Sequence, residues 1–216
     1  MVEEVEPKFT EDEDLERAKA FWKENGRSII TGIILGVVAI GGYNGWQVWQ
    51  KSQGESASTL YENMQDSSIT YEAAASIVED LKSDYGTTPY AATASLLMAK
   101  KAVENGALSE AASQLQWVLS NTEDTGLQHI ARIRLAMVRL AEGDADATLR
   151  LVKDFAREGG EPEFVSRYYE IQGDALAENG DVDAARESYT QAQALLPGGA
   201  SNSSLLKLKL DNLGNF

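Results

Sequence analysis

The chain has 216 residues, of which 43% are hydrophobic, and it carries a formal net charge of −15. This composition is sufficient for one domain of ordinary size with a terminal extension, and it argues against a mainly disordered chain. The acidic excess argues against a nucleic-acid-binding surface, which needs clustered Lys and Arg. Because the sequence contains no cysteine, disulfides, thiol nucleophiles and cysteine-based metal sites are excluded.

Histidine chemistry is also restricted, because the chain has a single histidine, His129. General-base and metal sites usually recruit several histidines or a histidine with carboxylates. We interpret His129 as a residue on the surface of a helix rather than as a catalytic group. No nucleophile–base pair, phosphate loop or metal-ligand spacing accompanies the many carboxylates. The sequence therefore predicts a protein that is not an enzyme and that uses no cofactor or metal.

Residues 1–27 form an acidic tail that ends in a short amphipathic stretch. Thr10 and Glu13 fit a capping box, and Leu15 and Trp22 then recur at helical spacing. We interpret this stretch as the beginning of a membrane helix that lies in the interface. A soluble cytoplasmic partner that reads the charged tail is an open alternative.

Residues 28–50 contain no charge. As a helix they extend about 34 Å, which exceeds the ~30 Å hydrocarbon layer of a bilayer. Trp22, Trp46 and Trp49 flank the segment, as interfacial aromatic rings do. A cleaved secretory signal has an apolar core of only about 7–15 residues, and the possible cleavage site at 56–58 is weak. A buried helix of a soluble domain is disfavoured by five glycines. We predict a single transmembrane helix over 28–50.

The orientation of this helix follows from the basic residues around it. Four of them lie shortly before the span, namely Arg17, Lys19, Lys23 and Arg27, whereas only Lys51 follows it closely. Basic residues are retained on the cytoplasmic side. We therefore expect a cytoplasmic N-terminus and an exported segment over 51–216.

The span also contains residues that allow another membrane helix to approach closely. Gly32 with Gly36, and Gly41 with Gly45, are pairs of small residues four positions apart. Asn44 can donate a hydrogen bond across such an interface. We predict that these five residues contact other transmembrane helices.

The exported segment is acidic and helical in pattern, with 13 basic and 25 acidic residues over 52–216. Gly106, Gly143 and Gly180 are spaced 37 residues apart, each after an apolar helical stretch. Three further positions repeat with them: Ala99, Ala136 and Gly173 stand seven residues before, Ala111, Thr148 and Ala185 five after, and Leu115, Val152 and Tyr189 nine after. The pattern predicts helix–turn–helix units in which small residues allow close packing beneath a left-handed glycine turn.

We expect these units over about 92–125, 129–162 and 166–199, followed by a C-terminal capping helix over 201–213. Upstream, 57–85 has the pattern of another helical pair, either a cap or a diverged repeat. The third unit resembles a tetratricopeptide repeat at Tyr169, Gly173, Leu176, Ala185, Tyr189, Ala192 and Pro197, whereas the first two lack its aromatic and proline positions. The expected fold class is all-α, an N-terminal single transmembrane helix followed by a tetratricopeptide-like helical repeat solenoid.

Both halves of the chain together resemble one known family. The matching features are the acidic tail, the pair Phe21-Trp22, the triplet Asn25-Gly26-Arg27, the glycine-rich span ending in tryptophans and the repeat domain. These features are similar to those of the ancillary SecYEG translocon subunit family. The resemblance implies a single-pass inner-membrane protein of Gram-negative bacteria with its repeat domain in the periplasm.

The same resemblance implies the partners. Members of the family associate with the SecYEG translocon and with a membrane-anchored periplasmic chaperone of the parvulin-type prolyl isomerase class. The implied function is to help newly translocated proteins pass from the channel to periplasmic folding factors. The alternative function is an inner-membrane-anchored repeat scaffold for cell-wall or outer-membrane assembly.

Stacked repeats line a concave surface with their first helices. In the middle unit this surface is apolar, with Leu96 of the preceding unit beside Ile130, Ile133, Met137 and Leu140. We predict that these residues form a groove for a client or a partner helix. The competing interpretation is that core packing or the C-terminal helix covers them.

Overall fold

The computed structural model describes residues 11–66, 68–158, 161–196 and 203–213. The chain divides into two compact units, Met1–Ser52 and Gln53–Phe216. The predicted cap residue Thr10, the repeat residue Pro197 and the start of the predicted capping helix at 201–202 lie outside the described residues.

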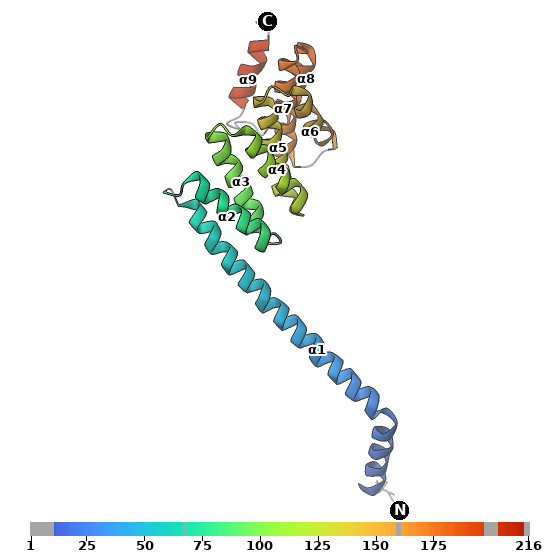
Figure 1. The fold of residues 1–216 in the computed structure, drawn as a ribbon. Coiled ribbons are helices and arrows are strands. Elements are labelled where there is room, and N and C mark those ends of the chain that lie inside the picture. Colours follow the sequence, from blue (N-terminus) through green and yellow to red (C-terminus); the bar gives the residue numbers. More distant parts are fainter. Residues whose placement is uncertain (1–10, 67, 159–160, 197–202, 214–216) are drawn as a thin grey trace, which may run out of the picture. The chain divides into compact units, whose positions relative to one another are not determined.

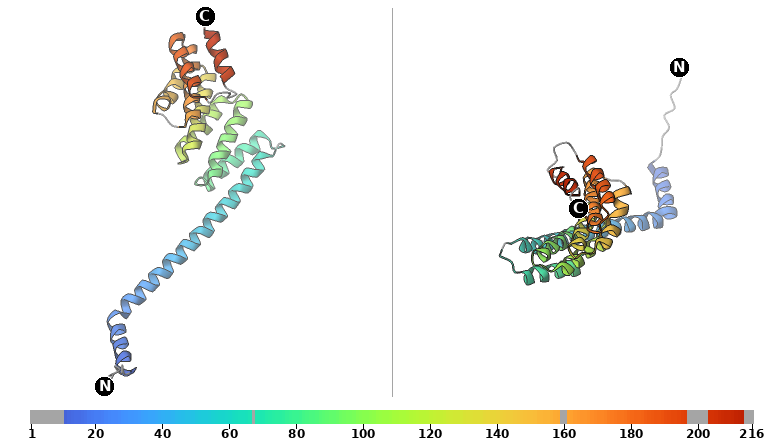
Figure 2. Two further views of the ribbon diagram at one scale, coloured as in Figure 1. Left: turned by 180° about the vertical axis from the view of Figure 1, so that it is seen from behind. Right: turned by 90° about the horizontal axis from the view of Figure 1, so that it is seen from above.

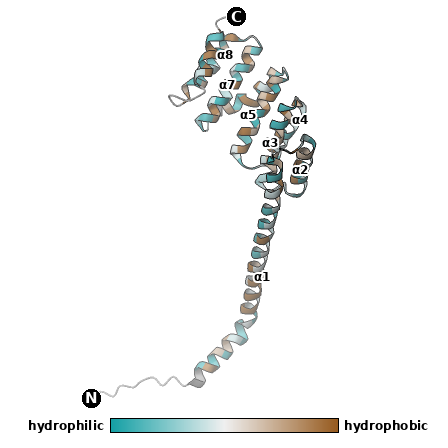
Figure 3. Ribbon diagram, turned by 90° about the vertical axis from the view of Figure 1, so that its left-hand side faces the viewer, coloured by the Kyte–Doolittle hydropathy of each residue, from teal (hydrophilic) through white to brown (hydrophobic). Residues whose placement is uncertain are grey.

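Helix α1 (Glu11–Gln65) contains the predicted membrane span. No proline interrupts it, and its glycines keep helical backbone angles, since the only glycines with positive φ are elsewhere in the described chain. Its apolar side chains are exposed, with none of the most apolar window buried, and Figure 3 shows this hydrophobic stretch along the middle of α1. The helix is thus long and apolar enough to cross a membrane, in agreement with the prediction.

The second compact unit, Gln53–Phe216, contains the end of α1 and eight further helices among the described residues (Figures 1 and 2). They are α2 (Tyr71–Asp84), α3 (Pro89–Glu104), α4 (Leu108–Asn121), α5 (Thr125–Ala141), α6 (Ala145–Glu158), α7 (Pro162–Glu178), α8 (Val182–Ala194) and α9 (Ser203–Asn212). Helices adjacent in the chain, from α2 through α8, pack against each other, and the first helices α3, α5 and α7 also contact in order. This is the stacked arrangement of a helical repeat.

The three repeated glycines end helices α3, α5 and α7 in the same way. Gly106, Gly143 and Gly180 have φ values of +77°, +79° and +82°, a region that residues with a Cβ rarely adopt. After Gly143, for example, the Asp144 amide donates to the Arg139 carbonyl at 2.9 Å, while the Gly143 amide donates to the Leu140 carbonyl at 2.9 Å. These bonds satisfy the last carbonyls of the helix in a Schellman motif. The predicted left-handed turns are confirmed.

Small residues bring the two helices of each pair together, as predicted. In the last pair, a Cβ built on Gly173 would lie 2.5 Å from the ring of Tyr189. In the middle pair, the buried Thr148 hydroxyl donates to the Ala136 carbonyl at 3.1 Å. Close approach in the first pair follows from two buried alanines, Ala99 and Ala111.

The two ends of the stack of three helix pairs are covered by additional helices. At the N-terminal end, Ala57 and Met64 of α1 are fully buried with Val78 and Leu81 of α2. At the C-terminal end, Leu206 at the start of α9 is fully buried against α8. Both ends of the stack are therefore covered by a helix that buries the apolar face of the terminal pair, as a solenoid requires.

Candidate partner-binding surfaces

The predicted contact residues of the span lie on two sides of α1. At 100° per residue, the nine positions between Gly32 and Gly41, or between Gly36 and Gly45, amount to two and a half turns. The two glycine pairs thus face opposite directions, with Asn44 between them. Beyond the local backbone of α1 itself, nothing lies within 4 Å of a Cβ built on any of these glycines.

Polar side chains accompany both glycine pairs: Asn44 lies three residues after Gly41, whereas a hydrogen-bonded pair of side chains lies on the Gly32–Gly36 side. Tyr43 lies seven residues after Gly36, hence on the same side of the helix. The Gln47 side-chain amide donates to the Tyr43 hydroxyl at 3.1 Å. The Gly32–Gly36 side therefore combines close approach with hydrogen-bonding groups, the two properties that favour association of helices in lipid.

The five predicted residues of the apolar stripe have different environments. Leu96 and Ile133 are buried, with 7% and 9% of their surface exposed, and belong to the cores between helices. Ile130 and Leu140 are partly buried. Met137 is 44% exposed. Core packing, the competing interpretation, thus accounts for Leu96 and Ile133, whereas Met137 remains accessible to a partner.

A groove of about 480 Å³ opens beside Met137, between α3 and α5. Its apolar lining includes Ala99, Val103, Leu108, Met137, Val138 and Ala141, and its charged lining consists of Lys100, Glu104 and Arg134. We call it the α3–α5 groove. The described residues that line it come from α3, α4 and α5, so α9 does not line it. Its volume lies within the range of about 300–1,000 Å³ that is typical of ligand sites.

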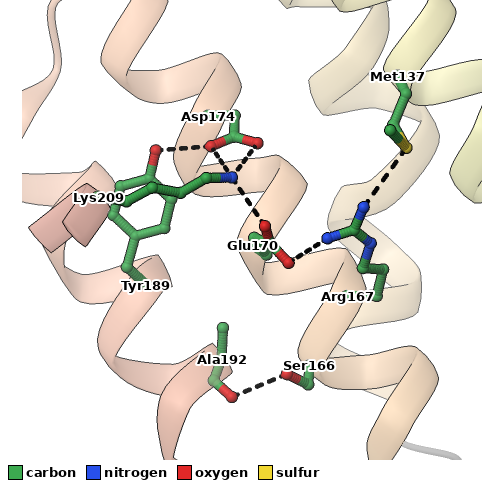
Figure 4. A network of polar contacts seen from close by, with 8 residues as sticks. All are labelled: Met137, Ser166, Arg167, Glu170, Asp174, Tyr189, Ala192 and Lys209. Carbon is green, nitrogen blue, oxygen red and sulfur yellow. Dashed lines mark hydrogen bonds and ion pairs between the residues drawn. The ribbon is translucent and has the colours of Figure 1, made fainter. Parts of the chain in front are cut away.

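The C-terminal helix instead binds the last repeat pair through a lysine (Figure 4). Lys209 of α9 donates to Glu170 at 2.8 Å and to both carboxylate oxygens of Asp174 at 2.7 and 2.8 Å. Arg167 also donates to Glu170, and the Tyr189 hydroxyl donates to Asp174 at 2.8 Å. This network ties α9 to both helices of the pair.

Two pKa values reflect this network. Burial raises the pKa of the Glu170 carboxyl, but the hydrogen bond from Lys209 and the charges of Arg167 and Lys209 outweigh burial, so the net pKa lies below its usual value. Burial and the hydrogen bond to Asp174 raise the pKa of Tyr189. The Glu170 carboxylate is thus held in its charged form and the Tyr189 phenol in its neutral form at neutral pH.

The interpretation of His129 as a surface residue was wrong. Its ring is half-buried, stacks on Phe164 with ring centres 4.8 Å apart, and lies edge-on to Phe155. Its Nδ1 is 2.8 Å from the hydroxyl of Tyr168, whose pKa burial raises to about 12. The partners lie on α6 and α7, so no spacing around position 129 indicated them. The histidine joins the middle and last repeat pairs.

A stack of helix pairs preceded in the chain by one helix that is long and apolar enough to cross a membrane defines a helical-repeat protein of the tetratricopeptide class with a candidate membrane anchor. Comparison with protein families gives the same class, since residues 19–215 match the tetratricopeptide repeat-like domain family. Among curated proteins, the ancillary SecYEG translocon subunit of Haemophilus influenzae is 34% identical, over 94% of this chain and 97% of the relative.

The relative of that name in Escherichia coli is 31% identical over 94% of this chain and 96% of its own length. A third, from Neisseria gonorrhoeae, is 28% identical over 94% of this chain and 97% of the relative. The chain belongs to the ancillary SecYEG translocon subunit family. No solved structure matches it in the same kind of comparison.

Proposed function

We propose that the chain is an ancillary subunit of the SecYEG translocon, anchored in the inner membrane by residues 28–50. Its N-terminus is cytoplasmic and its repeat domain is periplasmic. The observation that carries the proposal is the extent of the family relationship, since the similarity to named translocon subunits covers 94% of the chain and includes the span. Repeats alone occur in many unrelated scaffolds.

The repeat domain binds a membrane-anchored periplasmic chaperone of the parvulin-type prolyl isomerase class, and through it receives newly translocated proteins. The accessible Met137 beside an apolar groove supports a surface for a partner. The span contacts the translocon with the side that carries Gly32 and Gly36. This assignment is supported by the adjacent Tyr43–Gln47 hydrogen bond, since polar groups strengthen helix association in lipid.

A permanent anchor is supported by the continuity of α1 past the span. Ala57 lies at the possible signal cleavage site and is fully buried in the core formed with α2 and α3. Cleavage there would cut a helix within its packed part. The cytoplasmic N-terminus rests on the distribution of Lys and Arg around the span.

Affinity purification of the full-length chain from membranes in mild detergent tests the proposal. Quantitative recovery of SecY, SecE and SecG is expected. A matched variant, in which residues 28–50 are replaced by an unrelated apolar span, should retain the membrane anchor and lose these subunits. Recovery of cell-wall or outer-membrane assembly factors in place of the channel would instead support the scaffold alternative.

Site-specific crosslinking tests the chaperone contact separately. A photoreactive residue at Met137 should capture the chaperone or a translocated client. The same residue at the exposed Lys153 of α6 is the control and should capture neither. Crosslinks from Met137 only to the chain's own α9 would contradict the partner assignment.

A further inference from the structure

The α3–α5 groove differs in charge from the rest of its domain. The repeat segment has about twice as many acidic as basic residues, yet the groove is lined by two cations, Lys100 and Arg134, and by one acid, Glu104. Lys100 and Glu104 form an ion pair of 3.6 Å with both side chains well exposed, so the pair contributes little.

Arg134 has the weakest internal partners of the three. Its Nη1 donates to the Leu96 carbonyl at 3.4 Å, a long bond. Across residues 11–66, 68–158, 161–196 and 203–213, no carboxylate lies within ion-pair distance of Arg134. A planar guanidinium with unused donors at the edge of an apolar groove is suited to bind a carboxylate.

The last repeat pair provides an internal comparison. Position 100 of α3 corresponds, after two periods of 37 residues, to position 174 of α7. Asp174 there meets a cation from the second helix further along the chain, Lys209 of α9. At the earlier junction the corresponding residue is Lys100, and the second helix further along, α5, contributes another cation, Arg134. The terminal junction is therefore bridged by opposite charges, whereas no ion pair bridges α3 and α5: the carboxylate of Glu104 pairs with Lys100 in its own helix, and Arg134 leaves the groove with a net positive charge.

We propose that the α3–α5 groove binds an amphipathic segment of another protein through an apolar side chain and an adjacent carboxylate. The apolar side chain packs beside Val103 and Met137, which are 45% and 44% exposed. The carboxylate lies between Lys100 and Arg134 and supplies the charge that Asp174 supplies at the terminal junction. The chain's own α9 is not the occupant, because its lysine would meet two cations.

This inference rests on the proposed function, of which it specifies the partner chemistry. An acidic amphipathic segment fits the groove in two respects. Burial of its apolar side chain drives binding, and attraction between its carboxylate and the cations of the groove favours it over other segments. Basic segments are disfavoured by like charges. The repeat domain would thereby discriminate among exported chains and chaperone segments by charge, at an otherwise unspecific apolar site.

Binding of two helix-stabilised synthetic peptides to the full-length chain in nanodiscs tests the proposal. Both peptides carry two leucines one helical turn apart; one has glutamates beside the leucines, and the other has lysines at the same positions. Fluorescence anisotropy should give about fivefold tighter binding of the glutamate peptide, the size expected for a partly exposed charge pair. A photoreactive leucine in that peptide should crosslink to Met137 or Val103.

Charge reversal at the groove provides the decisive comparison. Arg134→Glu should abolish or invert the preference for the glutamate peptide, whereas Lys153→Glu on the exposed surface of α6 changes the net charge equally and should preserve it. Unchanged circular dichroism and melting temperature establish that both variants are folded. A second readout, Met137→Gln, should weaken both peptides, because it removes apolar contact without changing charge.

Three outcomes overturn the inference: equal affinity for the two peptides, an unchanged preference in Arg134→Glu, or crosslinks confined to residues outside the groove. Occupation of the groove by a second copy, seen as a dimer that Arg134→Glu dissociates, also overturns it. These outcomes leave the recovery of SecY by the full-length chain unaffected. Conversely, loss of SecY recovery with an intact peptide preference rejects the proposed function and retains the groove.

Discussion

The ring of Tyr189 packs directly against the backbone of Gly173, and a Cβ added to that glycine would lie 2.5 Å from the tyrosine Cε1. The glycine is therefore required by its neighbour on α8, although its own backbone is helical. Because Tyr189 is only 3% exposed and its hydroxyl is bonded to Asp174, the ring has no alternative position nearby.

Gly173→Ala should accordingly destabilise the repeat domain by about 1–3 kcal/mol, the usual cost of overpacking a core. Alanine is the better helix former by about 1 kcal/mol, so a loss of stability isolates the steric effect. Gly54→Ala is the matched control, since a Cβ on Gly54 of α1 meets nothing within 4 Å. Urea unfolding of the full-length chain should show no loss for the control; equal stability of the two variants would contradict the packing argument.

The turn glycines require a different test, because their constraint is the backbone. Gly143 has φ of +79° and no atom within 4 Å of an added Cβ. Gly143→Ala should cost about 1 kcal/mol through left-handed backbone strain alone. Gly143→Asn should cost less, because asparagine tolerates this conformation. If alanine and asparagine have the same effect on the unfolding midpoint, strain is not the cause.

These two kinds of glycine explain what the sequence could predict. A period of 37 residues with a glycine in each unit is a local signal, because a left-handed turn must recur wherever it closes a helix pair. The small-residue positions were likewise readable, since close helix packing requires them. Helix type and pairing therefore followed from the sequence.

Side-chain partners between helices were much less predictable. The sequence predicts a capping helix over 201–213 but not the acidic partners of its Lys209, which lie 35 and 39 residues earlier. The sequence around His129 indicates a surface position, because its stacking partner Phe164 lies on another helix, α7, and leaves no local signal. At position 133 an apolar residue is expected in a buried core and in an open groove alike, so the identity of Ile133 does not distinguish the two. Such outcomes depend on tertiary contacts that have no fixed sequence spacing.

Removal of the lysine contact should loosen α9. Lys209→Met leaves Glu170, which is 3% exposed, with Arg167 alone, and costs about 1–3 kcal/mol for the unmet charge and hydrogen bonds. Hydrogen exchange should accelerate in α9 while α3 and α4 keep their protection. Lys207→Met, at an exposed position of the same helix, is the control. Equal exchange in the two variants would show that Leu206 and its neighbours hold α9 unaided.

The same contact predicts a dependence on pH. The folded pKa of Glu170 lies below its ordinary value of 4.5, so its ion pairs contribute fully to stability above that pH. The contribution is lost as the pH falls through the lower, folded pKa. Glu170→Gln should therefore be less stable than the natural chain at pH 7, and the gap in urea midpoints should narrow at acidic pH. A difference in urea midpoint that does not change with pH would contradict the assigned pKa direction. The control is Glu178→Gln, at an exposed position of α7, which should change the urea midpoint only slightly.

The two sides of the span can be separated by single substitutions. Gly36→Leu should reduce recovery of the translocon, because a bulky side chain blocks close approach on the side that carries Tyr43 and Gln47. Gly41→Leu changes the opposite side by the same volume and should have a smaller effect. Val38→Leu is the control for a general change in the apolar span.

Quantitative recovery of SecY from membranes, normalised to the amount of anchored chain, is the measurement. A helix that used both sides equally would lose recovery in Gly36→Leu and Gly41→Leu alike. Such a result would place the span between two partner helices, since Gly36 and Gly41 are five residues apart and therefore point about 140° away from each other around the helix. If neither substitution changes the recovery of SecY, the channel contacts a part of the chain other than the two glycine sides of the span.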